Sequence, residues 1–196
     1  MPSNMTLKGK GTSTGTSTRA IRIPKDLDRI LQQEAKRRNI SINGLISSVL
    51  TKFSEWDRYA EGFGLAGVPI HILKRLALLV DEDLIAKTGS ELGPELLRSE
   101  VIFWFKEATL ETFLDWFALF SKYSGLIDGS ITKTDGAYVI VVRHEMGRKG
   151  SVFLKNYFES AFKTGLGIAP ETEISEFQVS LRLHNTRIAS RETLAS

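Results

Sequence analysis

Residues 143–151 hold the side chains best suited to chemistry in the second half of the chain. This stretch joins a segment rich in β-branched residues to one with helical periodicity, a kind of connection where ligands often bind. His144, Arg148, Lys149 and Ser151 form a candidate ligand or anion site. The last three would open a helix, whose free N–H groups attract anions.

Proton transfer is the catalytic chemistry that this stretch could support, through His144 and Glu145. However, such charged connections between a strand and a helix are common without any activity. The chain has no cysteine and three histidines, none at metal-ligand spacing from another, and no phosphate-loop or dinucleotide-binding motif. We therefore expect no enzyme activity, no catalytic residue, no metal site and no cofactor.

A second group of polar side chains lies near the start of the chain, where positive charge is concentrated. Residues 1–58 hold 11 Lys and Arg against 5 Asp and Glu, whereas residues 59–196 hold 15 against 18. This asymmetry indicates two parts with different partners. Residues 1–17 are rich in Gly, Ser and Thr, which predicts a flexible basic tail.

Residues 18–60 predict a strand followed by two helices. Ile21 and Ile23 alternate with Arg22, as in a strand with one buried face, and Pro24 ends that strand. Residues 25–38 have helical periodicity, and Asn39 suits the left-handed residue that ends a helix. A second helix starts after Ser41, a good N-cap residue, and carries an apolar stripe. So small a unit leaves its single strand unpaired, so we expect it to pair with a second copy.

The stretch RAIRIPKDLDRILQQEAKRRNISINGLISSVLTKF resembles the ribbon-helix-helix family of Arc/MetJ/CopG-type repressors. The shared features are a short alternating strand ending in Ile-Pro, a helix, a turn before Ser41 and a second helix that opens Ile-Asn-Gly-Leu-Ile. The resemblance implies an intertwined homodimer whose paired strands enter the major groove of duplex DNA. It covers about a fifth of the chain.

The resemblance also implies which residues contact DNA. The outward side chains of the strand would contact bases: Thr18, Ala20 and Arg22. The guanidinium of Arg22 can bond guanine O6 and N7 together, which contributes about 1–3 kcal/mol of discrimination. The residues expected to contact phosphates are Lys25, Ser41, Ile42 and Asn43. The free N–H groups at the start of the second helix suit a phosphate oxygen, and the basic residues 36–38 would add attraction.

The rest of the chain predicts a linker at residues 61–68, a C-terminal α+β domain at 69–184 and a polar tail at 185–196. Helical periodicity over 69–124 is interrupted at Leu92-Gly93-Pro94, and Thr109 is a candidate N-cap. Asp135-Gly136 lies between two β-rich segments and predicts a hairpin. A helix over 150–163 and a strand over 174–183 follow, so the domain reads as helices and then β-β-α-β. Its aromatic cluster, residues 103–120, would form an apolar effector pocket, a packed core or a dimer interface.

The sequence as a whole therefore predicts an α+β protein that acts as a homodimeric, sequence-specific transcriptional regulator, such as a repressor, in the cytoplasm. Its expected partners are double-stranded DNA, a second or further copy of itself, and a small-molecule or protein effector. No membrane partner is expected, because the start lacks the apolar core of a signal peptide and no long apolar run is present. The alternatives are an antitoxin-like or other protein-interaction module with a DNA-binding N-terminus, and an enzyme that depends on His144 or Glu145.

Overall fold

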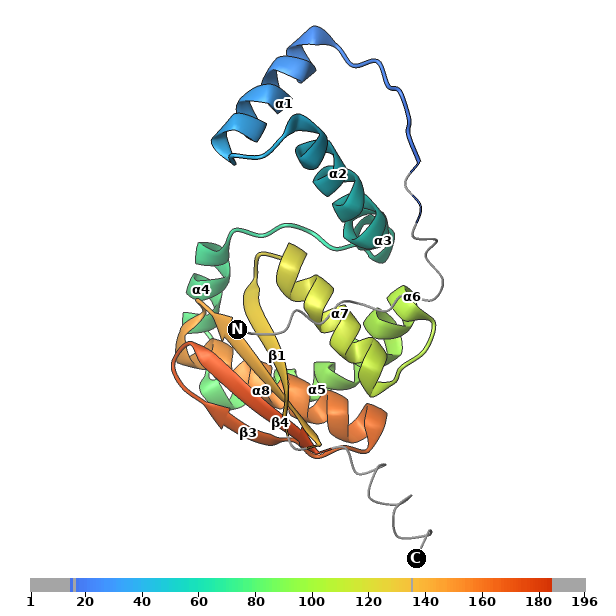
Figure 1. The fold of residues 1–196 in the computed structure, drawn as a ribbon. Coiled ribbons are helices and arrows are strands. Elements are labelled where there is room, and N and C mark those ends of the chain that lie inside the picture. Colours follow the sequence, from blue (N-terminus) through green and yellow to red (C-terminus); the bar gives the residue numbers. More distant parts are fainter. Residues whose placement is uncertain (1–14, 16, 135, 185–196) are drawn as a thin grey trace, which may run out of the picture. The chain divides into compact units, whose positions relative to one another are not determined.

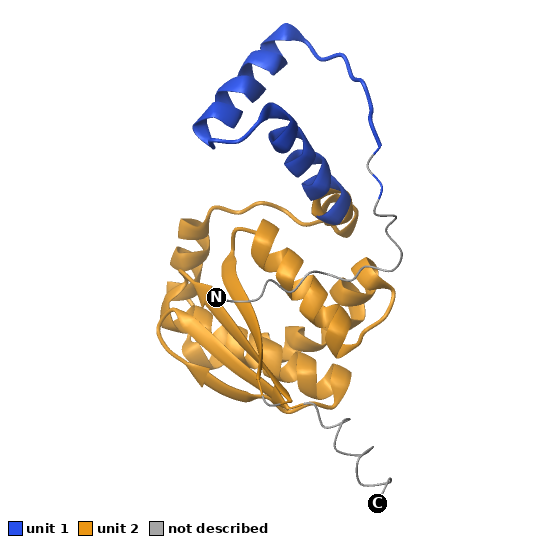
Figure 2. Cartoon of the chain, in the orientation of Figure 1, with its two compact units in different colours: residues 1–55 blue, residues 56–196 orange. Residues whose placement is uncertain are grey.

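The computed structural model describes residue 15, residues 17–134 and residues 136–184. Apart from residues 15 and 17, the tails expected at 1–17 and 185–196 lie outside the described residues. The chain is helix-rich, with a four-stranded antiparallel sheet toward its C-terminus (Figure 1). It divides into two compact units, residues 1–55 (unit 1) and residues 56–196 (unit 2) (Figure 2).

The described elements follow one another in a simple order, with short π-helical segments (η1 and η2) extending two of the helices. They are α1 (Lys25–Arg37), α2 (Ile42–Lys52), η1 (Phe53–Asp57), α3 (Arg58–Phe63), α4 (Ile70–Leu78), α5 (Glu82–Glu95), η2 (Leu96–Val101), α6 (Ile102–Phe105), α7 (Leu110–Tyr123), β1 (Ile127–Thr134), β2 (Ala137–His144), α8 (Gly147–Leu166), β3 (Glu171–Ile174) and β4 (Gln178–His184).

The predicted ribbon-helix-helix fold class is wrong at the N-terminus. Residues 17–24 form no strand, and the regular structure of the described chain begins with α1. Ile21 and Ile23 do alternate with Arg22, but a strand also needs a neighbour for its backbone N–H and C=O groups. No described strand pairs with this segment, and Ile21 is 66% exposed. Alternation alone therefore did not define a strand.

The predicted strand count of the C-terminal sheet is also wrong. The region expected as one strand over 174–183 contains the end of β3, a turn and β4, so the order is β-β-α-β-β. The turn is closed by a hydrogen bond from the N–H of Ser175 to the carbonyl of Gln178, at 2.8 Å. β3 was missed because its sequence, Glu-Thr-Glu-Ile, has only one large apolar residue.

In unit 1 the turn between α1 and α2 is defined by local hydrogen bonds. Asn39 adopts the predicted left-handed conformation, with φ of 54°. The N–H of Ile40 donates to the carbonyl of Ala35 at 3.0 Å, which closes a Schellman motif at the end of α1. Ser41 is the predicted N-cap of α2, and its Oγ accepts the N–H of Gly44 at 3.0 Å.

The sheet of unit 2 has the strand order β1-β2-β4-β3, and α7 and α8 cover one of its faces (Figure 1). Alternate residues of the two central strands point to that face and are buried: Tyr138, Ile140, Val142, Val179, Leu181 and Leu183. Aromatic rings from the helices fill the space above them, as between Phe113 and Phe162, whose centroids lie 4.6 Å apart. α7 begins at the predicted cap, where Thr109 and Thr112 form a capping box.

The hairpin predicted at Asp135-Gly136 is confirmed. β1 and β2 pair from Ile127 opposite His144 to Thr134 opposite Ala137, and Gly136 has φ of 75°. Asp135 lies outside the described residues.

The close approach of α5 and α8 holds the helical layer of unit 2 together. A Cβ at Gly89 would lie 2.6 Å from the carbonyl oxygen of Phe153, and one at Gly93 would collide with the carbonyl oxygen of Tyr157. Two glycines spaced by one helical turn therefore let the α8 backbone lie directly against α5.

The break predicted at Leu92-Gly93-Pro94 is wrong, because α5 continues through Pro94 to Glu95. Proline has no N–H, so the carbonyl of Ser90, four residues earlier, loses its helical donor. The hydroxyl of Ser160, on α8, donates to that carbonyl at 2.7 Å. The neighbouring helix thus satisfies the acceptor that the proline leaves free, and the helix need not end.

This replacement predicts a dependence between Ser160 and Pro94. We expect Ser160→Ala to lower the free energy of unfolding by about 0.5–1.5 kcal/mol, because the Ser90 carbonyl loses its donor. In a Pro94→Ala background the restored N–H serves that carbonyl, so Ser160→Ala should have much less effect. Urea unfolding of the four proteins of this double-mutant cycle measures the coupling. Equal losses in both backgrounds would contradict the interpretation.

Candidate functional site

The residues predicted to contact bases lie in the segment before α1. Thr18, Ala20 and Arg22 are all exposed, and no regular element positions their side chains. Arg19 is exposed as well. It was left out of the predicted contacts because it is in phase with Ile21 and Ile23, which a strand would have turned inward. Without a strand, alternate residues do not point to opposite faces, and Arg19 is exposed like Arg22.

The residues predicted to contact phosphates lie at the starts of the two helices of unit 1. Lys25 is the first residue of α1, and Ser41, Ile42 and Asn43 open α2. The Ser41 side chain accepts only the Gly44 N–H, so the N–H groups of Ile42 and Asn43 lack a helical acceptor. The first turn of α2 has no acidic residue, which keeps its positive end suited to an anion.

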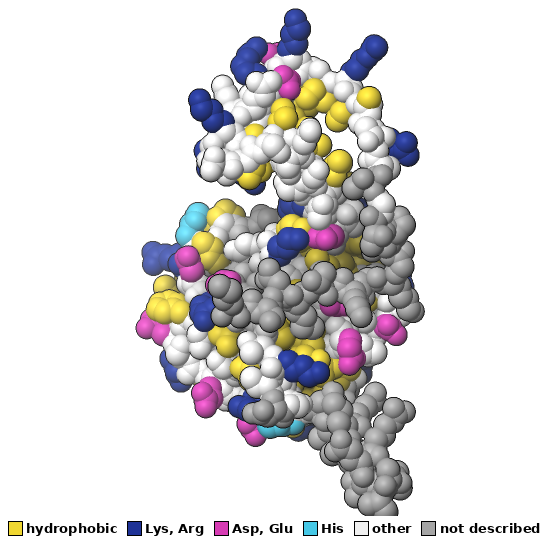
Figure 3. All heavy atoms as spheres, viewed as in Figure 1, with side chains coloured by type: hydrophobic (Ala, Val, Ile, Leu, Met, Phe, Trp, Pro, Cys, Tyr) yellow, Lys and Arg dark blue, Asp and Glu magenta, His cyan; other side chains and the backbone are white. Residues whose placement is uncertain are grey.

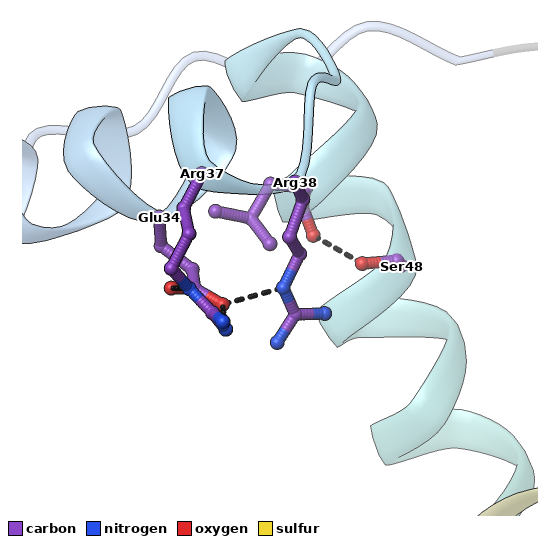
Figure 4. A network of polar contacts seen from close by, with 5 residues as sticks. Glu34, Arg37, Arg38 and Ser48 are labelled. Atoms are coloured by element: carbon purple, nitrogen blue, oxygen red, sulfur yellow. Dashed lines mark hydrogen bonds and ion pairs between the residues drawn. The ribbon is translucent and has the colours of Figure 1, made fainter.

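The cations of unit 1 fall into two classes. Glu34 binds Arg37 at 2.7 Å and also pairs with Arg38, and these two hydrogen bonds lower the pKa of Glu34 to about 2 (Figure 4). Arg29 pairs with Asp26 at 3.0 Å. Two of the three basic residues at 36–38 are therefore partly neutralised by Glu34, which lies on α1. The three consecutive basic residues in the sequence did not indicate this pairing.

The remaining cations have no acidic partner among the described residues: Arg19, Arg22, Lys25 and Lys36. Arg19 and Arg22 precede α1 in the sequence, Lys25 is its first residue, and Lys36 lies in its last turn. Their charge is available to an external anion. Figure 3 shows Lys and Arg side chains projecting from the surface of unit 1.

Unit 1 also exposes a large share of its apolar side chains, some of them visible in Figure 3. Ala35 and Leu45 are the buried apolar residues of its two helices. The exposed large ones, which we call the apolar face of unit 1, are Ile21, Leu27, Ile30, Ile40, Val49, Leu50 and Phe53. Soluble single chains rarely leave so many clustered apolar side chains uncovered, so this face indicates an interaction surface.

In unit 2 the structure brings two of the predicted ligand-site residues together. His144 Nε2 lies 2.9 Å from Ser151 Oγ, and both side chains are buried, Ser151 completely. The N–H of Met146 donates to His144 Nδ1 at 3.1 Å. The hydroxyl of Ser151 donates to the carbonyl of Glu176 at 3.2 Å.

These contacts determine the proton positions. Because Nδ1 accepts a hydrogen bond, the proton of the neutral ring is on Nε2, which donates to Ser151. The hydroxyl of Ser151 donates its own hydrogen bond to a backbone carbonyl. His144 is therefore not arranged to act as a base toward this hydroxyl. Burial also lowers the pKa of His144 below its usual 6.5, which favours the neutral ring. The contacts join the end of β2, the start of α8 and the turn before β4.

Arg148 and Lys149 point away from the His144–Ser151 pair. Lys149 Nζ donates to the carbonyls of Val80 at 2.6 Å and Leu78 at 3.3 Å, where α4 ends. Arg148 lies 3.8 Å from Glu82, at the start of α5. The four residues predicted as one ligand or anion site are thus divided between an internal network and contacts that hold α4 and α5 in place.

Glu145 also has a partner within unit 2. Its carboxylate lies 2.9 Å from Lys74 Nζ, and this contact lowers the pKa of Glu145. An ionised, paired carboxylate is a weak proton acceptor, because taking up a proton would break the pair.

A scan against models of known protein families gave no match, and a comparison with curated protein sequences gave none at a significant level. Within the described ranges, no helix is both long and apolar enough to cross a membrane. No group of three or more His, Asp or Glu side chains in the described part of the chain could hold a metal ion.

Burial of neutral His144 predicts a pH dependence of stability. The pKa of His144 is lower in the folded chain than in the unfolded chain, so the unfolded chain binds more protons below about pH 6.5. The free energy contributed by this group is present above that pH and is lost as the pH falls toward the folded pKa. Unfolding in urea between about pH 7.5 and pH 5 should show this loss, and His144→Gln should remove its histidine component.

His71→Gln, at an exposed histidine, is the matched control and should leave the pH dependence unchanged. Burial raises the pKa values of Glu100 and Asp115, which shifts stability in the opposite direction with pH. The decisive quantity is therefore the difference between each variant and the parent chain. An equal pH response in His144→Gln and the parent would show that the imidazole is not buried as a neutral group.

Proposed function

We propose that the protein binds double-stranded DNA as a homodimer through unit 1 and acts as a sequence-specific transcriptional regulator in the cytoplasm. The observation that carries the proposal is the set of exposed, unpaired cations Arg19, Arg22, Lys25 and Lys36, together with the acid-free N-terminus of α2. The proposed contacts come from the segment before α1 and from the start of α2, and they need no strand.

Phosphate binding would follow from two features of unit 1. Cations without a protein partner release condensed counterions when they meet DNA phosphates, which favours binding and makes it sensitive to salt. At the start of α2, the N–H groups of Ile42 and Asn43 and the polar side chains of Ser41 and Asn43 suit a phosphate oxygen. Base recognition is assigned to Arg22, whose planar guanidinium can pair with guanine, with Thr18 and Ala20 beside it.

Dimer formation is supported by the apolar face of unit 1. Two helices with one buried apolar residue each have too small a core to be stable alone. Val49 and Leu50 lie near the end of α2 and Phe53 is the first residue of η1, which continues it, so these residues follow one another at spacings of one and three and present a continuous strip. A second copy would cover the same strip by two-fold symmetry, and a two-fold dimer fits two half-sites on DNA.

Unit 2 would serve further assembly or the sensing of a small-molecule or protein effector. Its continuous core, built from α7, α8 and the sheet, favours this role over an antitoxin-like one. An antitoxin-like C-terminal region would gain its structure by covering a partner. Unit 2 instead buries its aromatic and aliphatic side chains against one another.

Replacing Arg22 tests the proposed contact with bases. We expect Arg22→Ala to weaken binding to the specific site by about 1–3 kcal/mol, because a bidentate pair with a base is lost. Lys25→Ala should weaken binding to specific and random duplexes alike, and should lower the slope of log affinity against log salt by about one. Fluorescence anisotropy with DNA from upstream of the coding sequence and with a random duplex, over a range of salt, measures both effects.

Arg75→Ala is the control for these substitutions, because Arg75 is an exposed cation on α4 of unit 2. It should leave affinity and salt slope unchanged. If the folded Arg22→Ala and Lys25→Ala proteins bind both duplexes as the parent does, unit 1 is not the DNA-binding surface.

Replacing one residue of the apolar face tests the dimer. We expect Leu50→Glu to convert the protein from dimer to monomer, because a carboxylate would have to be buried in the interface. Sedimentation equilibrium measures the mass. Leu79→Glu changes a leucine of unit 2 that is 82% exposed, and it should leave the dimer intact. A parent chain that sediments as a monomer, or a Leu50→Glu variant that stays dimeric, would contradict the proposed interface.

A further inference from the structure

Unit 2 contains a cavity of about 400 Å³ that the proposed DNA contacts do not use. Three stretches of unit 2 form its walls: the region from η1 to the segment before α4, α4 itself, and the end of α7 with the turn after it. The side chains that matter for its chemistry are those of Trp56, Ala60, Val68, Leu73, Phe120 and Tyr123.

The walls of the cavity are mostly apolar and carry no charged side chain. None of its lining residues is Asp, Glu, Lys, Arg or His, and the polar side chains among them are the hydroxyl-bearing Tyr123 and Ser124. A charged molecule would lose its hydration there without gaining an opposite charge. Uncharged molecules with apolar surface and an oxygen or nitrogen for a hydroxyl partner are therefore favoured.

One wall of the cavity belongs to a packed aromatic cluster. The ring of Trp56 lies 5.6 Å from that of Trp104 and 5.9 Å from that of Phe120, between centroids. Phe120 in turn stacks on Trp116 at 4.9 Å. Rings held by other rings keep their orientation, so this wall is already formed and presents aromatic surface to a flat ligand.

The same cluster contains two hydrogen-bond donors without acceptors. The indole N–H groups of Trp104 and Trp116 are buried and have no partner among the described residues. An unpaired buried donor is unfavourable, whereas most indole N–H groups in protein interiors have an acceptor. Neither Trp104 nor Trp116 lines the cavity, so these donors do not select its ligand.

We propose that this cavity binds an uncharged small molecule with about two or three rings. A cavity of about 150 Å³ accepts benzene, so the larger space here suits a molecule of that size. Trp56 is the first residue of unit 2 and forms part of the wall, so a bound ligand contacts the start of that unit. The use of this cavity as an effector site rests on the proposed function, whereas ligand binding itself does not.

The test is a titration of the full-length protein with N-phenyl-1-naphthylamine, an uncharged three-ring dye whose fluorescence rises in apolar surroundings. We expect saturable binding of one dye per chain, with energy transfer from tryptophan.

Ala60→Phe and Val68→Trp each fill the cavity from a different wall and should weaken binding at least tenfold. Val68 lies in an exposed segment, so its variant keeps the test available if Ala60→Phe fails to fold. Ala169→Phe, at an exposed alanine, is the matched control and should bind as the parent does.

Dye binding that does not saturate, or that the folded filling variants leave unchanged, would overturn the cavity site and would place the dye on exposed apolar surface. The titration contains no DNA, so the two proposals fail separately. DNA affinity is measured in parallel on the same proteins, with and without dye. Loss of dye binding with normal DNA binding in the variants, together with a dye-dependent DNA affinity in the parent, is the result expected of an effector site.

Discussion

The contact between α5 and α8 is the constraint on which unit 2 depends. α8 lies between α5 on one side and the strands β2, β3 and β4 on the other, so its position determines how the helical layer meets the sheet. Gly89 and Gly93 allow the two backbones to touch, and Ser160 supplies the donor that Pro94 lacks. Steric fit and hydrogen bonding act at the same place, so neither helix can shift along the other without losing both.

The elements set by local interactions were predictable from the sequence, and those set by distant partners were not. Gly136 and Asn39 adopt left-handed backbone conformations that suit these residue types. Ser41 and Thr109 each cap a helix by accepting the N–H of the residue three positions later. These features therefore follow from residues that are close in the sequence. At Pro94, by contrast, the carbonyl of Ser90 takes its donor from Ser160, 66 residues further along the chain than the proline. The strand predicted around Ile21 is also absent from the described residues, because alternation does not suffice without a second strand to pair with.

The candidate site of unit 2 shows how residue type can mislead. His144 and Ser151 are close enough for chemistry, but the ring and hydroxyl protons both have acceptors within the fold, and His144 Nδ1 has a donor. Lys149 likewise donates to the carbonyl of Leu78, the last residue of α4, and to that of Val80, two residues beyond it. The sequence predicted that these polar residues would lie close together. The hydrogen bonds of His144 and Ser151 link the end of β2, the start of α8 and the turn before β4. A catalytic group needs a proton or lone pair left for the substrate.

Unit 1 differs from unit 2, because its two helices bury few apolar side chains and expose many. Its charge and its apolar face act together in the proposed function. In the proposed dimer, the partner copy would complete the folding of so small a unit, and the stability of unit 1 would then increase with protein concentration. DNA binding would draw on the same equilibrium if pairing of the apolar faces sets the spacing of the two α2 N-termini. The apparent affinity for DNA would then be the intrinsic affinity multiplied by the fraction of chains that are paired. A ligand in unit 2 that shifts pairing would therefore regulate DNA binding without touching a single DNA contact.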